Sequence, residues 1–316
     1  MTLTQLSYVI AVDTYKHFAT AADKCFVTQP TLSMQIHKLE EELGVQLFNR
    51  RKQPIEVTEI GRKVIDQARI VYREAVKIDQ LISLHKGNIS GPFRLGVIPT
   101  VAPSLVPRFV QHFQKVCPEV NLIVEEMQTK DIIDRLNKDL LDAAIAATPL
   151  QEKDIKEQPL YYEPFKVFIP KDHGLAEQEE VTPDDLNVNE LLLLHEGHCF
   201  RNNVISLCRK KFDANGNNAQ PLSFESGNFD TLRRLVERGM GITLLPDMYL
   251  QDLDGYEQRK AVIRSFGEPV PGREVSLIFR KEQLKKQIIE MLRDTIIKNV
   301  PQAFREKSGI FVVEPR

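Results

Sequence analysis

Apolar residues in the first part of the chain repeat with the three- and four-residue spacing of short helices. The positions that share a face in the first two predicted helices are Leu3, Leu6, Val9 and Ile10, then Phe18, Ala21, Ala22 and Cys25. A third helix is expected to begin at the N-cap Thr28, with Pro30 in its first turn, and to end at Gly44. Its buried stripe consists of Leu32, Ile36, Leu39 and Leu43. A basic turn with Pro54, between residues 47–48 and 55–57, predicts a small β-wing.

One long helix is predicted from Glu59 to Lys86. Its opposite face is charged, and its apolar positions form a nearly heptad stripe of Ile60, Val64, Ala68, Val71, Ala75, Ile78 and Ile82. A helix of this length must bury that stripe, so we expect residues 59–90 to form a linker that pairs with a second copy of the chain. Gly87 and Gly91-Pro92 are expected to end the helix and form a hinge.

Strands and helices alternate beyond residue 92, which predicts an α/β sheet. The predicted strands are 93–98, 121–125, 143–147, 165–170, 191–194, 242–245 and 275–280, and the predicted helices are 101–116, 132–141, 200–212, 229–238 and 283–297. The pattern assigns no element to the tail from Val300, so residues 301–316 are treated as a separate segment.

Composition places the chain among soluble globular proteins. Its 316 residues predict about two domains, and 42% hydrophobic with 27% charged residues is ordinary for that class. The longest apolar runs are about five residues, whereas a membrane span needs about 20. The N-terminus lacks the basic region of a secretory signal, so we expect a cytoplasmic protein. Four cysteines make no disulfide framework, but they leave room for one redox pair.

The predicted third helix has a polar face suited to a DNA major groove. Short donors and acceptors lie on it, namely Thr28, Gln29, Thr31, Ser33, Gln35 and Lys38. Arg50 and Arg51, with Lys52, would follow the phosphate backbone from the wing. The charge distribution agrees only weakly, since residues 1–90 carry a net +2 and the remainder −4. An ordinary amphipathic helix with a solvated polar face explains the same pattern.

Several motifs in this region resemble a known DNA-binding family and so favour the DNA-binding interpretation of the third helix. Ala21-Ala22, the run from Val27 to Ser33, the run from Ile36 to Gly44, and Leu47-Phe48-Asn49-Arg50 resemble the winged helix-turn-helix of LysR-type transcriptional regulators. The run Gly239 to Pro246 is also similar to the effector domain of that family. The resemblance adds Pro30 to the DNA-binding residues.

The resemblance implies an N-terminal all-α winged helix-turn-helix, residues 1–58, followed by the dimerising linker. It also implies an α/β effector domain, residues 91–300, similar to periplasmic binding proteins. Its two subdomains would span about 91–162 with 270–300, and 163–269. Partners implied by the family are double-stranded promoter DNA, RNA polymerase and further copies of the chain, as a dimer of dimers.

Two cysteines lie close together in the effector domain. Cys199 is expected at a helix N-terminus, where the helix dipole, Arg201 and His198 would favour the thiolate, which is the form that attacks peroxide. Cys208 is nine residues away, about 13.5 Å along a helix, whereas a disulfide needs Cα atoms within about 7 Å. A bridge would therefore require the helix to bend or unwind, although two unrelated core cysteines remain an alternative.

The segment Gly197-His198-Cys199-Phe200-Arg201, with Cys208, resembles the sensing segment of a hydrogen-peroxide-responsive group within the LysR family. The motifs Ile98-Pro99-Thr100 and Gln128-Thr129 are similar to that group as well. The resemblance implies that Cys199 reacts with peroxide, that Cys208 resolves the product, and that a thiol–disulfide reductant resets the pair. Thr100, Thr129, His198 and Arg201 would form the peroxide pocket. Asn202 and the segment 223–225 depart from the expected pattern and put the tuning of the site in doubt.

Two other functions are compatible with parts of the pattern. A LysR-type regulator that binds a small metabolite between its subdomains would leave the cysteines incidental. A thiol peroxidase would need rapid recycling of Cys199 and no DNA-binding domain, so we expect no enzyme. No metal-ligand spacing, phosphate-binding loop or dinucleotide fingerprint is present, so no cofactor is expected.

Overall fold

The computed structural model describes residues 1–314 except 51, 53, 86–88, 209–225 and 254–260. The chain divides into two compact units, Met1–Asn88 and Ile89–Arg316, and each is described by itself. Part of the expected hinge, including Gly87, lies outside the described residues, as does segment 223–225. Among the described residues, no helix has the length and apolar character that a bilayer crossing requires.

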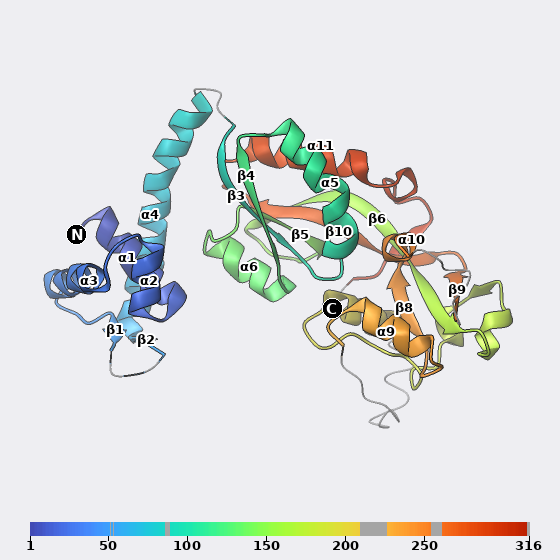
Figure 1. The fold of residues 1–316 in the computed structure, drawn as a ribbon. Coiled ribbons are helices and arrows are strands. Elements are labelled where there is room, and N and C mark those ends of the chain that lie inside the picture. Colours follow the sequence, from blue (N-terminus) through green and yellow to red (C-terminus); the bar gives the residue numbers. More distant parts are fainter. Residues whose placement is uncertain (51, 53, 86–88, 209–225, 254–260, 315–316) are drawn as a thin grey trace. The chain divides into compact units, whose positions relative to one another are not determined.

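The N-terminal unit is a helical bundle with a two-stranded wing (Figure 1). Its elements are α1 (Leu3–Tyr15), α2 (Phe18–Lys24), α3 (Gln29–Leu43), β1 (Phe48–Asn49), β2 (Glu56–Val57) and α4 (Glu59–His85). The predicted ends of α3 are confirmed: Thr28 Oγ1 accepts from the Thr31 N–H, and Gly44 adopts the left-handed conformation at the C-cap. The three helices and the wing share one apolar core, which includes Leu6, Ala21, Leu32, Ile36 and Leu39. The expectation that Leu43 belongs to the buried stripe of α3 is wrong: it lies in the last turn of the helix and is exposed.

The long helix α4 uses its apolar positions in two ways. Ile65 and Ala68 are buried in the core of the N-terminal unit. Ile60, Val71 and Ile78 are exposed in the single chain. Ala68 therefore packs within its own unit, whereas the other three remain available for the expected seam with a second copy.

The C-terminal unit combines a mixed sheet with helices on its faces. Its helices and short 3₁₀ turns are α5 (Ala102–Val116), α6 (Thr129–Asn137), η1 (Gly174–Glu177), η2 (Pro183–Asp185), α7 (Cys199–Leu207), α9 (Phe229–Val236), α10 (Asp247–Gln251), α11 (Lys286–Asn299) and η4 (Gln302–Phe304). Its strands are β3 (Gly91–Val97), β4 (Val120–Glu126), β5 (Ala143–Thr148), β6 (Ile155–Pro170), β7 (Glu180–Val181), β8 (Thr243–Pro246), β9 (Ala261–Phe266), β10 (Val270–Arg280) and β11 (Ile310–Val312).

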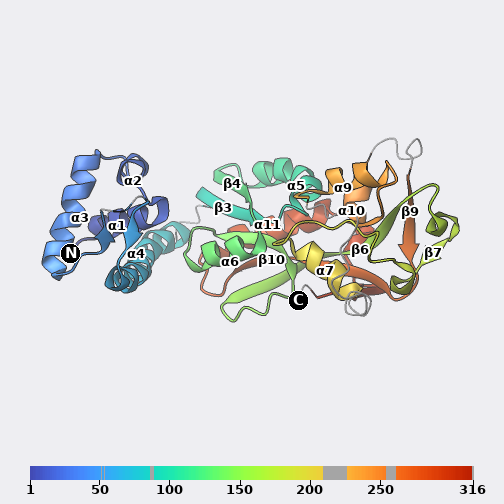
Figure 2. The ribbon, with the colours of Figure 1, turned by 90° about the horizontal axis from the view of Figure 1, so that it is seen from below.

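Two long antiparallel strands, β6 and β10, connect the two halves of this unit. The strand order is β4-β3-β5-β10-β6-β9-β7, with β11 added to β10 and β8 to β6. Residues 155–164 of β6 pair with β10, and residues 165–170 pair with β8 and β9. Helices α5 and α11 cover one face of the first half and α6 covers the other (Figures 1 and 2). The predicted α/β architecture is thereby confirmed.

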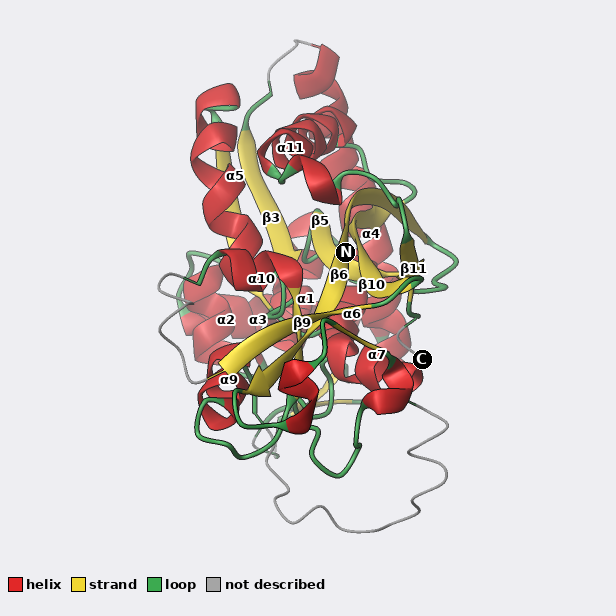
Figure 3. Ribbon diagram, turned by 90° about the vertical axis from the view of Figure 1, so that its right-hand side faces the viewer, coloured by secondary structure: helices red, strands yellow, loops and turns green. Residues whose placement is uncertain are grey.

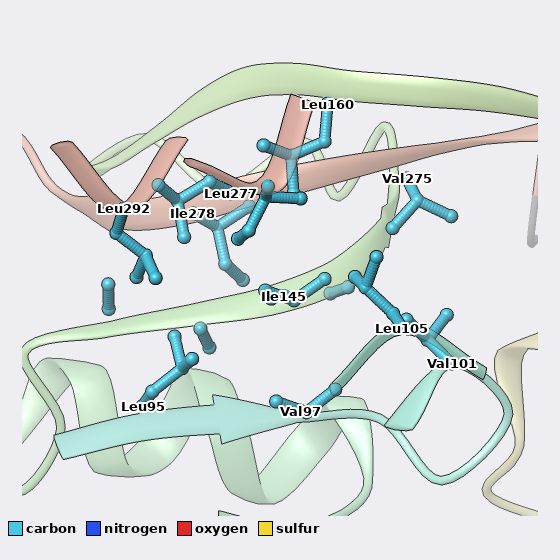
Figure 4. Close-up of a cluster of buried hydrophobic side chains, with 14 of the residues drawn as sticks. Leu95, Val97, Val101, Leu105, Ile145, Leu160, Val275, Leu277, Ile278 and Leu292 are labelled. Atoms are coloured by element: carbon cyan, nitrogen blue, oxygen red, sulfur yellow. The ribbon is translucent and has the colours of Figure 1, made fainter. Parts of the chain in front are cut away.

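Each half has its own hydrophobic core. The first core packs β3, β5 and β10 against α5 and α11, with Leu95, Leu105, Ile145, Leu277 and Leu292 among its members (Figure 4). The second core gathers around the far end of β6 and includes residues of α7, α9 and β8. A side chain that contacts both cores is therefore expected near the middle of β6 and β10, where these strands pass from one half to the other.

Several expectations differ from the structure in this unit. The strand predicted over 165–170 begins at Ile155, the helix predicted over 132–141 spans Thr129–Asn137, and no pattern predicted β9. Residues 191–194 form no regular strand and make only single bridges, Leu191 to Ile242 and Leu194 to Ser226. The helix predicted over 200–212 begins at Cys199 and ends at Leu207, and the rest of that range lies outside the described residues. The tail contains β11, which pairs in parallel with residues 270–272 of β10 because β5 pairs only with residues 274–278 of that strand.

Candidate redox site and DNA-binding surface

Cys199 and Cys208 lie at opposite ends of α7. Cys199 is the first residue of the helix and Cys208 is its C-cap; both are buried and neither forms a disulfide in this structure. Cys199 packs in the first hydrophobic core, whereas Cys208 packs in the second. The helix that was expected between the two cysteines is thus present, and it keeps the thiols in separate cores.

The Cys199 thiol is surrounded by groups that favour a negative charge. Burial raises the pKa of the Cys199 thiol, and it is opposed by the Arg273 guanidinium, the Thr129 hydroxyl and the backbone N–H groups of Phe200 and Ala147. The pKa remains above the ordinary cysteine value, so the expected low-pKa thiol is wrong for this state. Full burial of the thiol, which sequence position does not reveal, is the physical reason.

Arg273 is the charged residue that the sequence analysis missed. It lies on β10, is almost fully buried, and forms an ion pair of 2.6 Å with Glu163 on β6. It also donates to Thr100 Oγ1 at 2.9 Å and to the Thr100 carbonyl at 3.0 Å. Its guanidinium carbon lies 5.3 Å from the centre of the Phe200 ring. Arg273 therefore connects both long strands, the loop before α5, and α7.

Two expected pocket residues have other partners. Arg201 NH1 donates to the Leu194 carbonyl at 3.0 Å, and Arg273 rather than Arg201 is the guanidinium that most favours the Cys199 thiolate. His198 is buried and its Nε2 lies 3.2 Å from His195 Nε2. Burial and the neighbouring His195 lower the pKa of His198, so the neutral ring dominates at neutral pH. Arg273, and not the expected Arg201 and His198, is therefore the side chain whose charge favours the Cys199 thiolate in this structure.

The two threonines have complementary environments. Thr100 is buried and its hydroxyl accepts from Arg273. Thr129 begins α6, and its hydroxyl lies beside the Cys199 thiol. This buried oxygen has no partner at full hydrogen-bond geometry among the described residues. A hydroxyl with unused hydrogen-bonding capacity next to a thiol is suited to hold a small polar molecule.

The polar face of α3 has the exposure that DNA binding requires. The exposed members of the predicted set are Gln29, Pro30, Thr31, Lys38 and the preceding Thr28, whereas Ser33 and Gln35 are half-buried. Met34 lies on the same face and is 62% exposed. The sequence pattern did not indicate it, because only polar residues were assigned to that face. Arg51 lies outside the described residues.

Arg50 contacts the protein itself. It forms a 2.8 Å ion pair with Glu40, donates to Ser33 Oγ at 3.3 Å, and lies over the Phe18 ring. Glu40 in turn accepts from the backbone N–H groups of Leu47 and Phe48. This network fixes the wing on α3, so Arg50 positions the DNA-binding surface in addition to any phosphate contact.

Family comparisons agree with this arrangement. Residues 3–62 match the bacterial regulatory helix-turn-helix of the lysR family, and residues 86–300 match the LysR substrate binding domain. The chain therefore belongs to the LysR family of bacterial regulators, whose DNA-binding domain it carries at its N-terminus.

Individual relatives show to which group within the LysR family the chain is similar. The hydrogen peroxide-inducible genes activator of Pectobacterium carotovorum subsp. carotovorum is 35% identical over 94% of this chain and 96% of that protein. The DNA-binding transcriptional dual regulator OxyR of Escherichia coli K12 is 34% identical over 94% of this chain and 95% of that protein. Within the LysR family, the chain thus belongs with the OxyR proteins.

Solved structures give the same relationship. A full-length OxyR from Pseudomonas aeruginosa, with its cysteine replaced by aspartate, has a TM-score of 0.79 and 36% identity over 95% of this chain and 99% of that chain. A cysteine mutant of Corynebacterium glutamicum OxyR with hydrogen peroxide bound has a TM-score of 0.60 and 28% identity, over 94% of this chain and 92% of that chain.

Proposed function

We propose that this chain is a cytoplasmic transcriptional regulator that hydrogen peroxide switches through a reversible Cys199–Cys208 disulfide. The observation that carries the proposal is the position of Cys199, next to Arg273 and to the Thr129 hydroxyl, at one end of a helix whose other end is Cys208. The structure of the Corynebacterium relative with hydrogen peroxide bound supports the same signal. The protein acts as a regulator and not as an enzyme.

The first chemical step oxidises Cys199. Its sulfur attacks one peroxide oxygen, the O–O bond breaks, and the thiol proton ends on the departing oxygen, which leaves as water. Cys199 becomes a sulfenic acid. The Thr129 hydroxyl donates to a peroxide oxygen, while Arg273 stabilises the negative charge on sulfur as the proton leaves. Thr100, which Arg273 holds, and His198 and Arg201 complete the proposed pocket.

The second step forms the disulfide. The Cys208 sulfur attacks the Cys199 sulfur, the S–O bond breaks, and a second water leaves with the Cys208 proton. The two thiols thus supply the two electrons that reduce peroxide to water. A cellular thiol–disulfide reductant then supplies two electrons, is itself oxidised to a disulfide, and returns Cys199 and Cys208 to thiols.

The disulfide changes the shape of the effector unit. Nine residues of helix separate the cysteines by about 13.5 Å, and a disulfide needs Cα atoms within about 7 Å. Helix α7 must bend or unwind, and one thiol must leave its core. In a dimer of dimers, this rearrangement changes the spacing of the DNA-binding units on promoter DNA and alters recruitment of RNA polymerase.

The decisive experiment maps thiols in the reduced full-length protein after low-micromolar peroxide, by mass spectrometry of non-reduced peptides. We expect one stoichiometric Cys199–Cys208 bridge, which Cys199→Ser and Cys208→Ser abolish. Cys117→Ser is the matched control, because Cys117 is also buried in the first core but is remote in sequence from α7. Unmodified thiols, or over-oxidation of Cys199 without a bridge, contradict the proposal.

A further inference from the structure

The end of the chain reaches back to the helix that separates the two cysteines. Strand β11 pairs with residues 270–272 of β10, and the next residue, Val313, donates its N–H to the Gly272 carbonyl at 2.9 Å. The Val313 side chain is buried in the second core with Phe200, Val204 and Cys208. The C-terminal end of the described chain accordingly lies beside α7 (Figures 2 and 3). We call residues 310–313 the C-terminal strap.

Asn203 is the residue of α7 that holds the strap. It has no exposed surface, and its Nδ2 donates to the Val313 carbonyl. Its Oδ1 is buried and has no partner among the described residues. A half-satisfied buried amide is costly, so the bond to Val313 is the contact that stabilises Asn203 in this position. Val313 is thus bonded on one side to β10 and on the other to α7.

The position of Asn203 gives this contact a consequence for the redox pair. Asn203 lies between Cys199 and Cys208, in the segment that must bend or unwind before the thiols meet. Its side chain meets the Val313 carbonyl only while the helix keeps its present path over the strap. The contact therefore stabilises the reduced state and is lost in the disulfide state.

We propose that Asn203 is a positioning residue for the redox switch and that the C-terminal strap sets how readily Cys199 and Cys208 pair. This inference rests on the proposed peroxide-driven disulfide. Removing the contact destabilises only the helical state, so the equilibrium shifts toward the disulfide and bridging follows sulfenic acid formation more rapidly. The rate at which Cys199 first reacts with peroxide stays unchanged, because the strap does not contact that thiol in the described structure.

The test compares full-length wild type, Asn203→Ala and Asn202→Ala in glutathione buffers of defined ratio. The fraction of Cys199–Cys208 disulfide is read by mass spectrometry. Asn202 is the matched control, since it has the same side chain on the same helix but is exposed. One lost hydrogen bond corresponds to roughly a 3- to 10-fold higher equilibrium constant for the disulfide in Asn203→Ala. Asn202→Ala should stay near wild type.

A second variant removes residues 310–316, so the chain ends at Gly309. It should shift the equilibrium in the same direction as Asn203→Ala, and combining the two changes should add little. Equal equilibrium constants for Asn203→Ala and Asn202→Ala, or a shift toward the thiols, overturn the proposal. So does a full additional effect of the truncation in the Asn203→Ala background.

Amide hydrogen exchange of the reduced proteins separates this inference from the proposed function. Asn203→Ala should accelerate exchange in α7 and the strap and leave β3 and β5 unchanged, whereas general destabilisation accelerates exchange in all of them. If wild type forms no disulfide, the proposed function fails and the redox role of the strap fails with it. Faster exchange confined to α7 then leaves Asn203 as a structural contact only.

Discussion

Gly197 packs directly against the side chain of Gln128. Gly197 has φ of +96°, and a Cβ atom at this position would overlap the amide group of Gln128. Gln128 precedes Thr129, and Gly197 lies two residues before Cys199. The absence of a side chain at 197 therefore leaves room for the Gln128 amide beside the turn that leads into Cys199.

Gly197→Ala tests this close approach. Strain at this left-handed position should lower the free energy of unfolding by about 1–3 kcal/mol, whereas the flexible Gln128 amide can move aside. The rate of Cys199 oxidation by peroxide should fall, because the displaced turn separates the thiol from Thr129. Thermal unfolding and stopped-flow oxidation measure the two effects. Gly227→Ala is the control, since a Cβ there makes only ordinary contacts with His195. Equal oxidation rates in both variants would contradict the positioning role of Gly197.

The pH dependence of oxidation follows from the raised pKa of Cys199. Only the thiolate is a strong nucleophile, and the thiolate fraction grows tenfold per pH unit below the pKa. The oxidation rate should therefore keep rising between about pH 6 and pH 8, without the plateau that a low-pKa cysteine produces. Alkylation of Cys199 by iodoacetamide, followed by mass spectrometry, gives the same profile independently. A plateau already present at neutral pH would show that the Arg273 charge outweighs burial.

The main effect of Arg50→Ala should be a lower stability of the N-terminal unit and not the loss of a phosphate contact. Glu40 is 6% exposed and loses its guanidinium partner in this variant, so the unfolding free energy should fall by about 1–3 kcal/mol. Lys38→Ala removes an exposed charge and should leave stability near wild type while reducing the salt dependence of DNA binding by about one phosphate contact. Urea unfolding and binding at several salt concentrations distinguish the two. Wild-type stability of Arg50→Ala would contradict the Glu40 network.

Met34 should contribute an apolar contact to DNA recognition. It is an exposed thioether on the face of α3 that also carries Thr31 and Lys38, and thymine methyl groups are the apolar feature of the major groove. A duplex selected from random sequence by the full-length protein provides the probe. Replacing the contacted thymine by deoxyuridine should weaken wild-type binding about fourfold, and should not weaken binding of Met34→Ala further.

Leu43→Ala is the matched control for Met34→Ala, because Leu43 is an exposed apolar residue in the last turn of the same helix. It should retain the full effect of deoxyuridine. If no thymine-to-deoxyuridine change distinguishes wild type from Met34→Ala, Met34 makes no methyl contact.

The sequence predicts those features that depend on neighbouring residues. The cap at Thr28, the end of α3 at Gly44 and the helix that begins at Cys199 all follow from local chemistry and periodicity. Arg273 could not be found in this way, because it reaches Cys199 through the pairing of β10 with β6. The same reason applies to the strap residue Val313, whose role depends on a sheet edge that only the folded chain creates.

The passage of β6 and β10 between the two halves has a consequence for synthesis of the protein. Strand β5 hydrogen-bonds to β10, which is synthesised only after the rest of the second half. Until then, the fully buried residues of β5 present an unpaired apolar edge. The N-terminal unit contains only local chain segments and is able to fold long before that point. We therefore expect the nascent effector unit to be the part of the chain that needs chaperone protection.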